Sequence, residues 1–242
     1  MTLPSAPNQQ LNEPHRDGVA QRLNWLRAGV LGANDGIVSV AAIAVGVAGA
    51  TAASAAILTA GLAALVGGAI SMALGEYVSV SGQRDSERAL IARERRELAE
   101  TPEEELLELA GMYQAKGLTA ETALTVANEL TANDALKAHL SIELNIDADD
   151  VVNPWHAAFA SAIAFLVGGF IPLLAILLPA PSTRVPITFV VVLVALAVTG
   201  FLGAQLGGSG RRRAAARVVI GGALALIATF SIGALLGTTG VV

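Results

Sequence analysis

The stretch from Ala28 to Ala50, AGVLGANDGIVSVAAIAVGVAGA, contains a single ionisable side chain, that of Asp35. A helix needs roughly 20 predominantly apolar residues to cross the hydrocarbon core of a bilayer, so this stretch predicts a membrane span. Four further stretches meet the same criterion without any Lys, Arg, Asp or Glu: residues 52–75, 157–178, 185–210 and 218–242. Five such runs in 242 residues leave too little polar surface for the alternative, a soluble protein with buried helices.

Composition narrows the classes of function. Hydrophobic residues make up 54% of the chain and charged residues only 14%, against about 25% charged residues in a typical soluble domain. The chain has no cysteine and three histidines. Disulfides, thiolate metal sites and cysteine nucleophiles are therefore excluded, and any metal site must be built mainly from carboxylates. No nucleophile or cofactor motif is present, so we expect no enzyme, no prosthetic group and no nucleic-acid partner.

The basic residues indicate how the spans are oriented, because the cytoplasmic flanks of membrane helices carry an excess of Lys and Arg. Of the 15 basic residues, only Arg184 lies outside three segments: before the first span, between the second and third, and between the fourth and fifth. An odd number of spans puts these three segments on one side of the membrane. We therefore predict a cytoplasmic N-terminus, a cytoplasmic inserted segment and a C-terminus outside.

Two glycine pairs in the spans, Gly32 with Gly36 and Gly203 with Gly207, have the four-residue spacing that lets helix backbones approach closely in lipid. They predict close helix packing. The spacing alone favours packing within one chain at least as much as packing between two copies.

The segment between the second and third spans is strongly acidic, unlike the apolar spans, because it holds 16 of the 20 acidic residues. Its pattern predicts a helix over 81–100 that continues from the second span, then a new helix with Thr101 as N-cap, Pro102 in the first position and Glu104 completing a capping box. Gly117 is the expected C-cap, and further helices are expected over 120–130 and 134–144. The predicted fold is an all-α membrane protein in four parts: a cytoplasmic arm (1–24), two transmembrane helices (25–80), a cytoplasmic acidic helical domain (81–153) and three transmembrane helices (154–242).

Two pairs of glutamates in the acidic segment have i, i+3 spacing, which places both carboxylates of a pair on one helical face. The pairs are Glu94 with Glu97, and Glu105 with Glu108. The Thr101–Pro102 break allows the two helices to fold back on each other, and four adjacent carboxylates repel one another unless a divalent metal ion neutralises them. His139 and Glu143, spaced i, i+4, are further candidate ligands. The alternative is a solvated acidic face that pairs locally with Arg93, Arg95 and Arg96.

Two acids mark the spans themselves. Asp35 lies eight residues after Arg27, and Glu76 lies eight residues before Arg84, so on antiparallel helices each is about 12 Å from the basic flank. Charged side chains inside a bilayer are costly and usually face a transport pathway. Met72, one turn from Glu76, adds a thioether, and this donor set suits Fe²⁺ better than Mg²⁺. The alternative is a structural Asp35 hydrogen-bonded to backbone near Gly36.

Two motifs resemble a known family. Residues 26–39, LRAGVLGANDGIVS, and residues 71–80, SMALGEYVSV, together with the acidic insertion, resemble the vacuolar iron transporter (VIT) family, including its bacterial members. The resemblance extends from about Trp25 to the C-terminus. It implies a five-span protomer that forms a homodimer with the pore between protomers. It also implies export of Fe²⁺, often with Mn²⁺ and related ions such as Zn²⁺ or Co²⁺, by proton antiport.

The resemblance also implies roles for individual residues. Asp35, Met72 and Glu76 match positions along the translocation path. The metal ligands that it implies in the acidic domain are Glu94, Glu97, Glu105, Glu108 and Glu143. Plant relatives carry adjacent methionines just before the last of these glutamates, whereas this chain has His139 and Leu140, so His139 is the candidate substitute.

Two other functions stay open from the sequence. The chain could be a membrane-anchored metal sensor or buffer without metal flux, or a structural membrane protein whose acidic domain docks a basic partner. The Ala- and Gly-rich composition, with no cleaved signal peptide expected, favours a multi-pass protein of a bacterial plasma membrane, whose partners are divalent metal ions, protons and the lipid bilayer.

Overall fold

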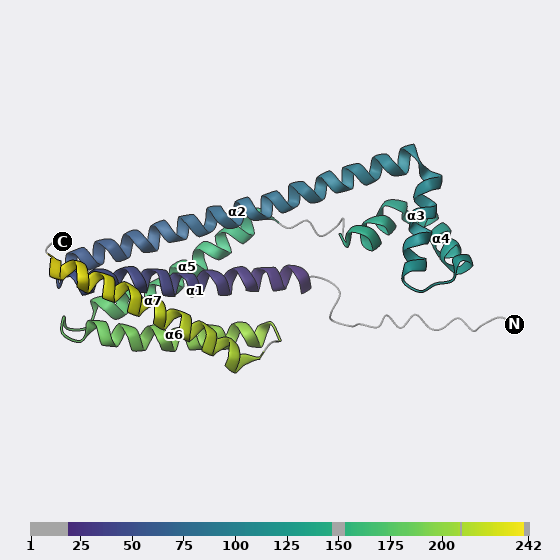
Figure 1. Ribbon diagram of the computed structural model, residues 1–242. Coiled ribbons are helices and arrows are strands. Elements are labelled where there is room, and N and C mark those ends of the chain that lie inside the picture. The colour runs from purple at the N-terminus through teal and green to yellow at the C-terminus, as the bar shows by residue number, and fades with distance from the viewer. Residues whose placement is uncertain (1–18, 147–152, 209, 240–242) are drawn as a thin grey trace, which may run out of the picture. The chain divides into compact units, whose positions relative to one another are not determined.

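Every regular element is helical in the part of the chain that the computed structural model describes, residues 19–146, 153–208 and 210–239 (Figure 1). Five helices are long and apolar enough to cross a membrane: α1 (Val19–Ala50), α2 (Ser54–Glu100), α5 (Pro154–Leu177), α6 (Arg184–Leu206) and α7 (Arg211–Thr239). The other elements are α3 (Pro102–Ala115), α4 (Ala120–His139) and a π-helical turn, η1 (Leu140–Leu144). The predicted all-α class with five candidate spans is confirmed for these residues. Most of the predicted N-terminal arm lies outside the described residues, and its last residues already belong to α1.

The chain divides into two compact units, which we call the span unit (residues 1–76 and 155–242) and the acidic unit (residues 77–154). Helix α2 contributes to both. Its 47 residues span about 70 Å at 1.5 Å per residue, more than twice the roughly 30 Å of a hydrocarbon core. Its apolar first part is therefore the candidate span, and we expect its charged last third, from Arg84 onward, to lie outside the hydrocarbon.

Glycines set the close packing of the span unit. A Cβ atom added to Gly36 would lie 2.2 Å from the carbonyl oxygen of Phe165 on α5, and one added to Gly32 would lie 2.7 Å from that of Ser161. A Cβ atom on Gly203 would meet a valine side chain of α1 at 2.9 Å. Gly32, Gly36 and Gly203 therefore pack helices of the same chain against one another, whereas a Cβ atom on Gly207 would meet only the carbonyl oxygen of Gly203 in its own helix.

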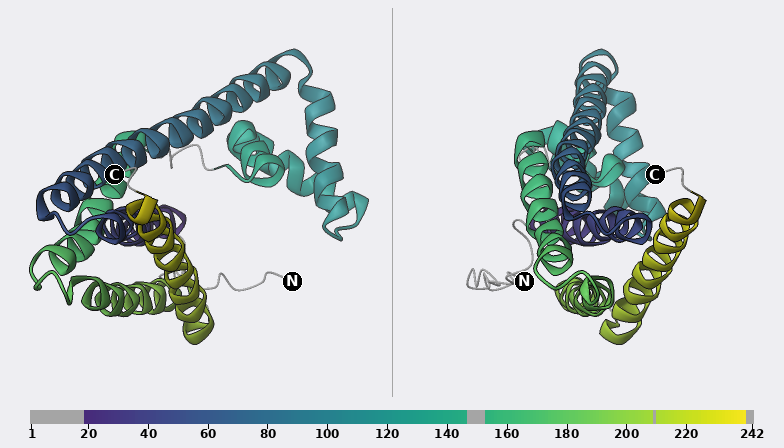
Figure 2. Two further views of the ribbon diagram at one scale, coloured as in Figure 1. Left: turned by 60° about the vertical axis from the view of Figure 1, so that its left-hand side comes forward. Right: turned by 90° about the vertical axis from the view of Figure 1, so that its left-hand side faces the viewer.

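Helices α6 and α7 both lie against α1 (Figures 1 and 2). Near the end of α7, a Cβ atom on Gly233 would lie 1.8 Å from the carbonyl oxygen of Gly46, close to the end of α1. At the beginning of α6, the nearly fully buried Arg184 donates from Nη2 to Ser54 Oγ, at 3.2 Å, where α2 begins. The helix ends that meet in these two pairs are ends that a five-span chain places at the same membrane face.

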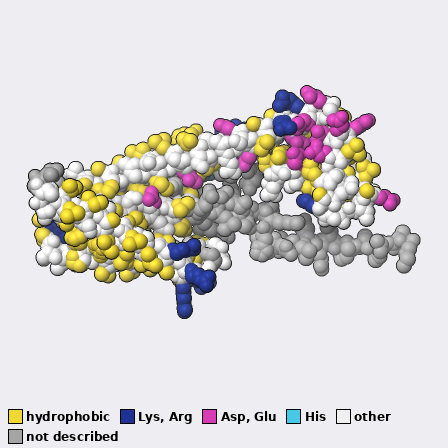
Figure 3. Space-filling view, in the orientation of Figure 1, with side chains coloured by type: hydrophobic (Ala, Val, Ile, Leu, Met, Phe, Trp, Pro, Cys, Tyr) yellow, Lys and Arg dark blue, Asp and Glu magenta, His cyan; other side chains and the backbone are white. Residues whose placement is uncertain are grey.

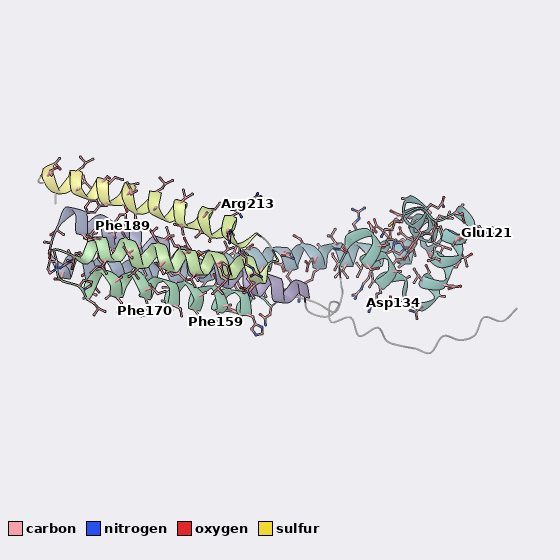
Figure 4. The ribbon with its side chains drawn as sticks, turned by 90° about the horizontal axis from the view of Figure 1, so that it is seen from below. Glu121, Asp134, Phe159, Phe170, Phe189 and Arg213 are labelled. Carbon is pink, nitrogen blue, oxygen red and sulfur yellow. The ribbon has the colours of Figure 1, made fainter. Side chains whose placement is uncertain are left out.

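The outside of the span unit is apolar. Large hydrophobic side chains are exposed along each of its five helices, and hydrophobic atoms cover most of the face shown in Figure 3. Phe159 and Phe170, both exposed, lie on the outer side of α5 (Figure 4). Monomeric soluble proteins rarely expose apolar patches of this extent, whereas lipid tails solvate them at no cost.

In the acidic unit, α3 begins as predicted, with Thr101 as N-cap and Pro102 in the first turn. The predicted capping box is wrong, because the Thr101 side chain makes no cap hydrogen bond. Its Oγ1 instead donates back to the carbonyl oxygen of Glu97, at 3.2 Å, in the last turn of α2. Lys116, not Gly117, is the C-cap, and Gly117 follows it with φ +101°, a conformation that suits glycine.

The two helices expected over 120–130 and 134–144 form one element with a kink. Thr119 caps α4 by accepting from the Thr122 amide, and Asp134 has non-helical dihedral angles (φ −160°, ψ 94°) inside it. Asp134 Oδ1 accepts from the Lys137 amide at 3.0 Å, as an N-cap side chain does for a new helix. Packing of α4 against α3 buries Leu109, together with small alanines of both helices.

Candidate metal centre

Three side chains from three elements of the acidic unit converge. Glu94 comes from the last turns of α2, Glu105 from the first turn of α3, and His139 from the last residue of α4. One ligand atom from each lies within 4.8 Å of the others, and all three residues are buried. The Thr101–Pro102 turn brings the two glutamates together, because it reverses the chain between them. The packing of α4 against α3 then places His139 against both.

His139 is the centre of the cluster and is fully buried. Its Nδ1 lies 3.0 Å from Glu94 Oε1 and 3.7 Å from Glu105 Oε2. Glu143 Oε2 lies 3.9 Å from the same nitrogen, and its side chain is about one third exposed. The turn η1 places Glu143 at the solvent side of the cluster, so the site is buried on one side and open on the other.

Three buried polar atoms of this cluster lack hydrogen bonds. Neither nitrogen of His139 has one, and neither does Glu94 Oε1, although the two residues approach to 3.0 Å. The two atoms are close enough for a hydrogen bond, but their relative orientation does not allow one. Each such buried polar atom costs about 1–3 kcal/mol. A cation placed between the three side chains would satisfy Glu94 Oε1 and the His139 Nδ1 that faces the carboxylates. A protonated imidazole ring would neutralise part of the negative charge, but its N–H groups would still not be oriented for hydrogen bonds to the carboxylates.

The carboxylates repel one another. Burial, followed by the charges of Glu143 and Glu105, raises the pKa of Glu94 to about 7. Burial and the charge of Glu108 also raise the pKa of Glu105, against a smaller lowering by His139. A carboxyl group with a pKa near neutrality can exchange a proton for a metal ion at cellular pH. Carboxylate oxygens with one imidazole nitrogen suit Fe²⁺, Mn²⁺, Co²⁺ or Zn²⁺.

The other predicted ligands lie further out. Glu97 Oε1 forms an ion pair with Arg93 Nε at 2.9 Å, which is the local pairing that the alternative interpretation expects. Glu108 is exposed. Both nevertheless contribute to the raised pKa values of the buried pair. The structure therefore gathers Glu94, Glu105 and His139, leaves Glu143 at the edge, and does not include Glu97 or Glu108 in the innermost group.

The acids predicted on the translocation path occupy two helices of the span unit. Asp35 is exposed on α1 and accepts a hydrogen bond from Ser39 Oγ at 3.0 Å, a side-chain bond and not the backbone bond of the alternative interpretation. Glu76 is half-buried on α2. Met72 packs against a cluster of buried side chains that includes Val40 of α1. No hydrogen bond or ion pair joins these residues in the described part of the chain.

Sequence reasoning did not identify two features near these sites. Thr199 Oγ1 of α6 donates to Asn34 Oδ1, so the residue next to Asp35 ties α1 to α6. A polar Asn in an apolar run was the available signal. The spacing of His139 and Glu143 did not indicate the π-helical turn after His139, because an i, i+4 pair is equally typical of an α-helix.

Comparisons with protein families and with individual known proteins give the same family. The family model described as "VIT family" matches residues 26–234. The chain is 45% identical over 210 residues, 86% of its length and 77% of the relative's, to a protein of Acanthamoeba castellanii named "Vacuolar iron transporter". It is 34% identical over 239 residues, 97% of its length and 93% of the relative's, to "Vacuolar iron transporter homolog 2.1" of Arabidopsis thaliana. It is also 34% identical over 204 residues, 83% and 82% of the two lengths, to "Vacuolar iron transporter 1" of the same plant.

Proposed function

This chain belongs to the VIT family, and from that premise we propose that it exports Fe²⁺, together with Mn²⁺, from the cytosol in exchange for protons. Relatives named as iron transporters support metal transport, and membership of a transporter family agrees with the expectation that the chain is not an enzyme. The observation that carries the proposal is the buried cluster of Glu94, Glu105 and His139, in which Glu94 Oε1 and both nitrogens of His139 lack hydrogen bonds.

In the proposed mechanism the acidic unit collects the ion. Divalent metal displaces the proton that Glu94 holds near neutral pH, because a carboxylate carries either a proton or a metal ion. The ion then passes to Asp35, Met72 and Glu76 of the span unit. Protons that arrive from the opposite side of the membrane compete for the same carboxylates and drive release.

The exposure of Asp35 supports the proposal of a homodimer. Asp35 shares the exposed face of α1 with Leu31 and Ile43. A carboxylate that faces lipid near the bilayer centre costs at least about 2.5 kcal/mol. A second copy that covers this face would remove Asp35 from lipid and enclose a polar pathway between the two protomers.

The distribution of basic residues supports the proposed orientation, with the N-terminus and the acidic unit in the cytoplasm. In that orientation the acidic unit meets cytosolic metal, as export requires. The plasma membrane of a bacterium as the location stays a prediction.

The test is metal flux in proteoliposomes that contain the full-length chain and a metal-sensitive dye. We expect the wild-type chain to carry Fe²⁺ and Mn²⁺, and we expect Asp35→Asn to abolish the flux while metal binding to the acidic unit persists. Asp85→Asn, which removes an exposed carboxylate of α2 outside the cluster, is the control and should transport normally. Undiminished flux in Asp35→Asn would show that the pathway is wrong.

A second candidate function, a metal sensor or buffer, is favoured by one observation: the cluster lies entirely within the acidic unit. This function predicts metal binding by the wild-type chain without any flux in the same proteoliposomes. The same experiment therefore separates the two functions.

A further inference from the structure

Four arginines stand at the beginning of α7, and they have no acidic neighbour in sequence. They are Arg211, Arg212, Arg213 and Arg217. Residues 151–242 contain no Asp or Glu, and within the described part of the chain none of the four forms an ion pair. Arg213 and Arg217 are i, i+4 neighbours, so their like charges repel each other. Figure 3 shows basic side chains gathered beside the apolar surface of the span unit, and Figure 4 places Arg213 where α7 begins.

The four arginines are not equivalent. The Arg211 guanidinium lies over the ring of Phe201 on α6, 5.6 Å from its centroid, in a cation–π contact. Arg213 and Arg217 instead line an open hollow of about 540 Å³, together with Gly210, Ala216 and Ile220. Two cations and a large apolar side chain therefore line one hollow on the surface of α7.

An apolar stripe continues from this hollow along the same face of α7. Ile220, Leu224 and Ile227 follow Arg213 and Arg217 at three- and four-residue spacing, and each is more than half exposed. From Arg217 to Ile227 the helix rises about 15 Å, which is comparable to the length of a lipid acyl chain. The face thus offers positive charge at one end and hydrocarbon contact over the rest.

We propose that this face binds one anionic phospholipid, with its phosphate between Arg213 and Arg217 and one acyl chain along Ile220, Leu224 and Ile227. Arginine binds phosphate oxygens through paired N–H donors, and the beginning of a long helix adds a favourable dipole. A free phosphate ion would use the two arginines but would leave the apolar stripe without a function. The proposal does not depend on metal transport, only on α7 crossing a membrane.

Native mass spectrometry of the full-length chain in detergent, titrated with phosphatidylglycerol or phosphatidylcholine of equal chain length, tests the site. We expect one phosphatidylglycerol per protomer to bind more tightly than phosphatidylcholine. The double variant Arg213→Gln/Arg217→Gln should lose about tenfold or more of that affinity, since each basic side chain near an anionic headgroup contributes several-fold. The control variant Arg211→Gln/Arg212→Gln removes the same charge from the same helix end and should keep most of the affinity.

Two measurements on the wild-type chain decide the question even if the double variant does not fold. Dihexanoyl phosphatidylglycerol should bind more weakly than the dioleoyl lipid, because its short chains cannot reach Leu224 and Ile227. Inorganic phosphate should not displace the bound lipid. Equal loss in both double variants would overturn the proposal in favour of diffuse charge. Equal binding of the two headgroups would overturn it as well, and displacement by inorganic phosphate would reassign the site to a free anion.

Discussion

At the scale of single residues, Glu94 and His139 form the centre of the proposed metal site. Both are buried, both have polar atoms without hydrogen bonds, and their closest atoms are 3.0 Å apart. Metal ligands must be deprotonated, so metal binding and proton release are coupled wherever a ligand has a raised pKa. The pKa of Glu94, raised to about 7, puts this coupling in the cellular range.

Removing a central ligand should weaken metal binding much more than removing an exposed acid. We expect His139→Ala and Glu94→Gln each to raise the Kd for Mn²⁺ by about tenfold or more, because changes even outside the ligand sphere cost 10- to 100-fold. Glu121→Gln is the control, because Glu121 (Figure 4) is exposed in the first turn of α4, whereas His139 is the last residue of that helix. Titration calorimetry on the full-length chain measures all three. An equal effect of Glu121→Gln would mean that the whole acidic surface binds metal diffusely.

The raised pKa of Glu94 also predicts how stability depends on pH without metal. The folded state holds this proton more tightly than the unfolded state, whose pKa is near 4.5. The resulting stability is complete below the unfolded value and is lost as the pH rises through about 7. At about 1.4 kcal/mol per pKa unit, the loss between pH 5 and pH 8 should be about 1–3 kcal/mol.

Thermal unfolding of the metal-free chain at pH 5, 6.5 and 8 measures this loss. Glu94→Gln, which is neutral at every pH, should flatten the dependence and be more stable than wild type at pH 8. The raised pKa of Glu105 acts in the same direction, so some dependence should persist. A wild-type curve that coincides with that of Glu94→Gln would contradict the buried position of Glu94.

At the scale of helices, glycine contacts hold the span unit together. Gly233→Ala should be destabilising by about 1–3 kcal/mol, because its Cβ would lie 1.8 Å from a backbone oxygen of α1 and the two helices would have to separate. Gly221→Ala on the same helix meets nothing within 4 Å and should be neutral or stabilising by up to about 1 kcal/mol. Thermal unfolding in detergent, followed by circular dichroism, compares the two. Equal shifts would mean that α7 does not pack on α1 through this face.

The same scale shows which elements the sequence could predict. The spans follow from apolar runs that contain at most one charged residue, and α3 follows from Thr101–Pro102, because both patterns are local. The prediction of a capping box was wrong because Thr101 Oγ1 donates to the carbonyl oxygen of Glu97 in the preceding helix. The π-helical turn η1 was not predicted, because the i, i+4 spacing of His139 and Glu143 is also that of an ordinary α-helix.

At the scale of the whole chain, the candidate site was predictable only in part. The glutamate spacing and the family resemblance named all the converging residues, because each lies on a helix whose face the spacing defines. Neither distinguished Glu94 and Glu105, which are buried, from Glu97 and Glu108, which are not. That difference depends on the angle at which α3 and α4 fold back against α2, a property of tertiary packing. The hydrogen bond between Thr199 and Asn34 also depends on tertiary packing, because it joins residues 165 positions apart in the sequence.

The most direct test of metal–proton exchange is to record both fluxes in the same proteoliposomes, with one dye for metal and one for internal pH. We predict that an imposed pH gradient drives Mn²⁺ or Fe²⁺ in the direction opposite to the protons, that reversing the gradient reverses the metal flux, and that a protonophore abolishes it. Metal flux that continues unchanged after the protonophore collapses the gradient would contradict the account.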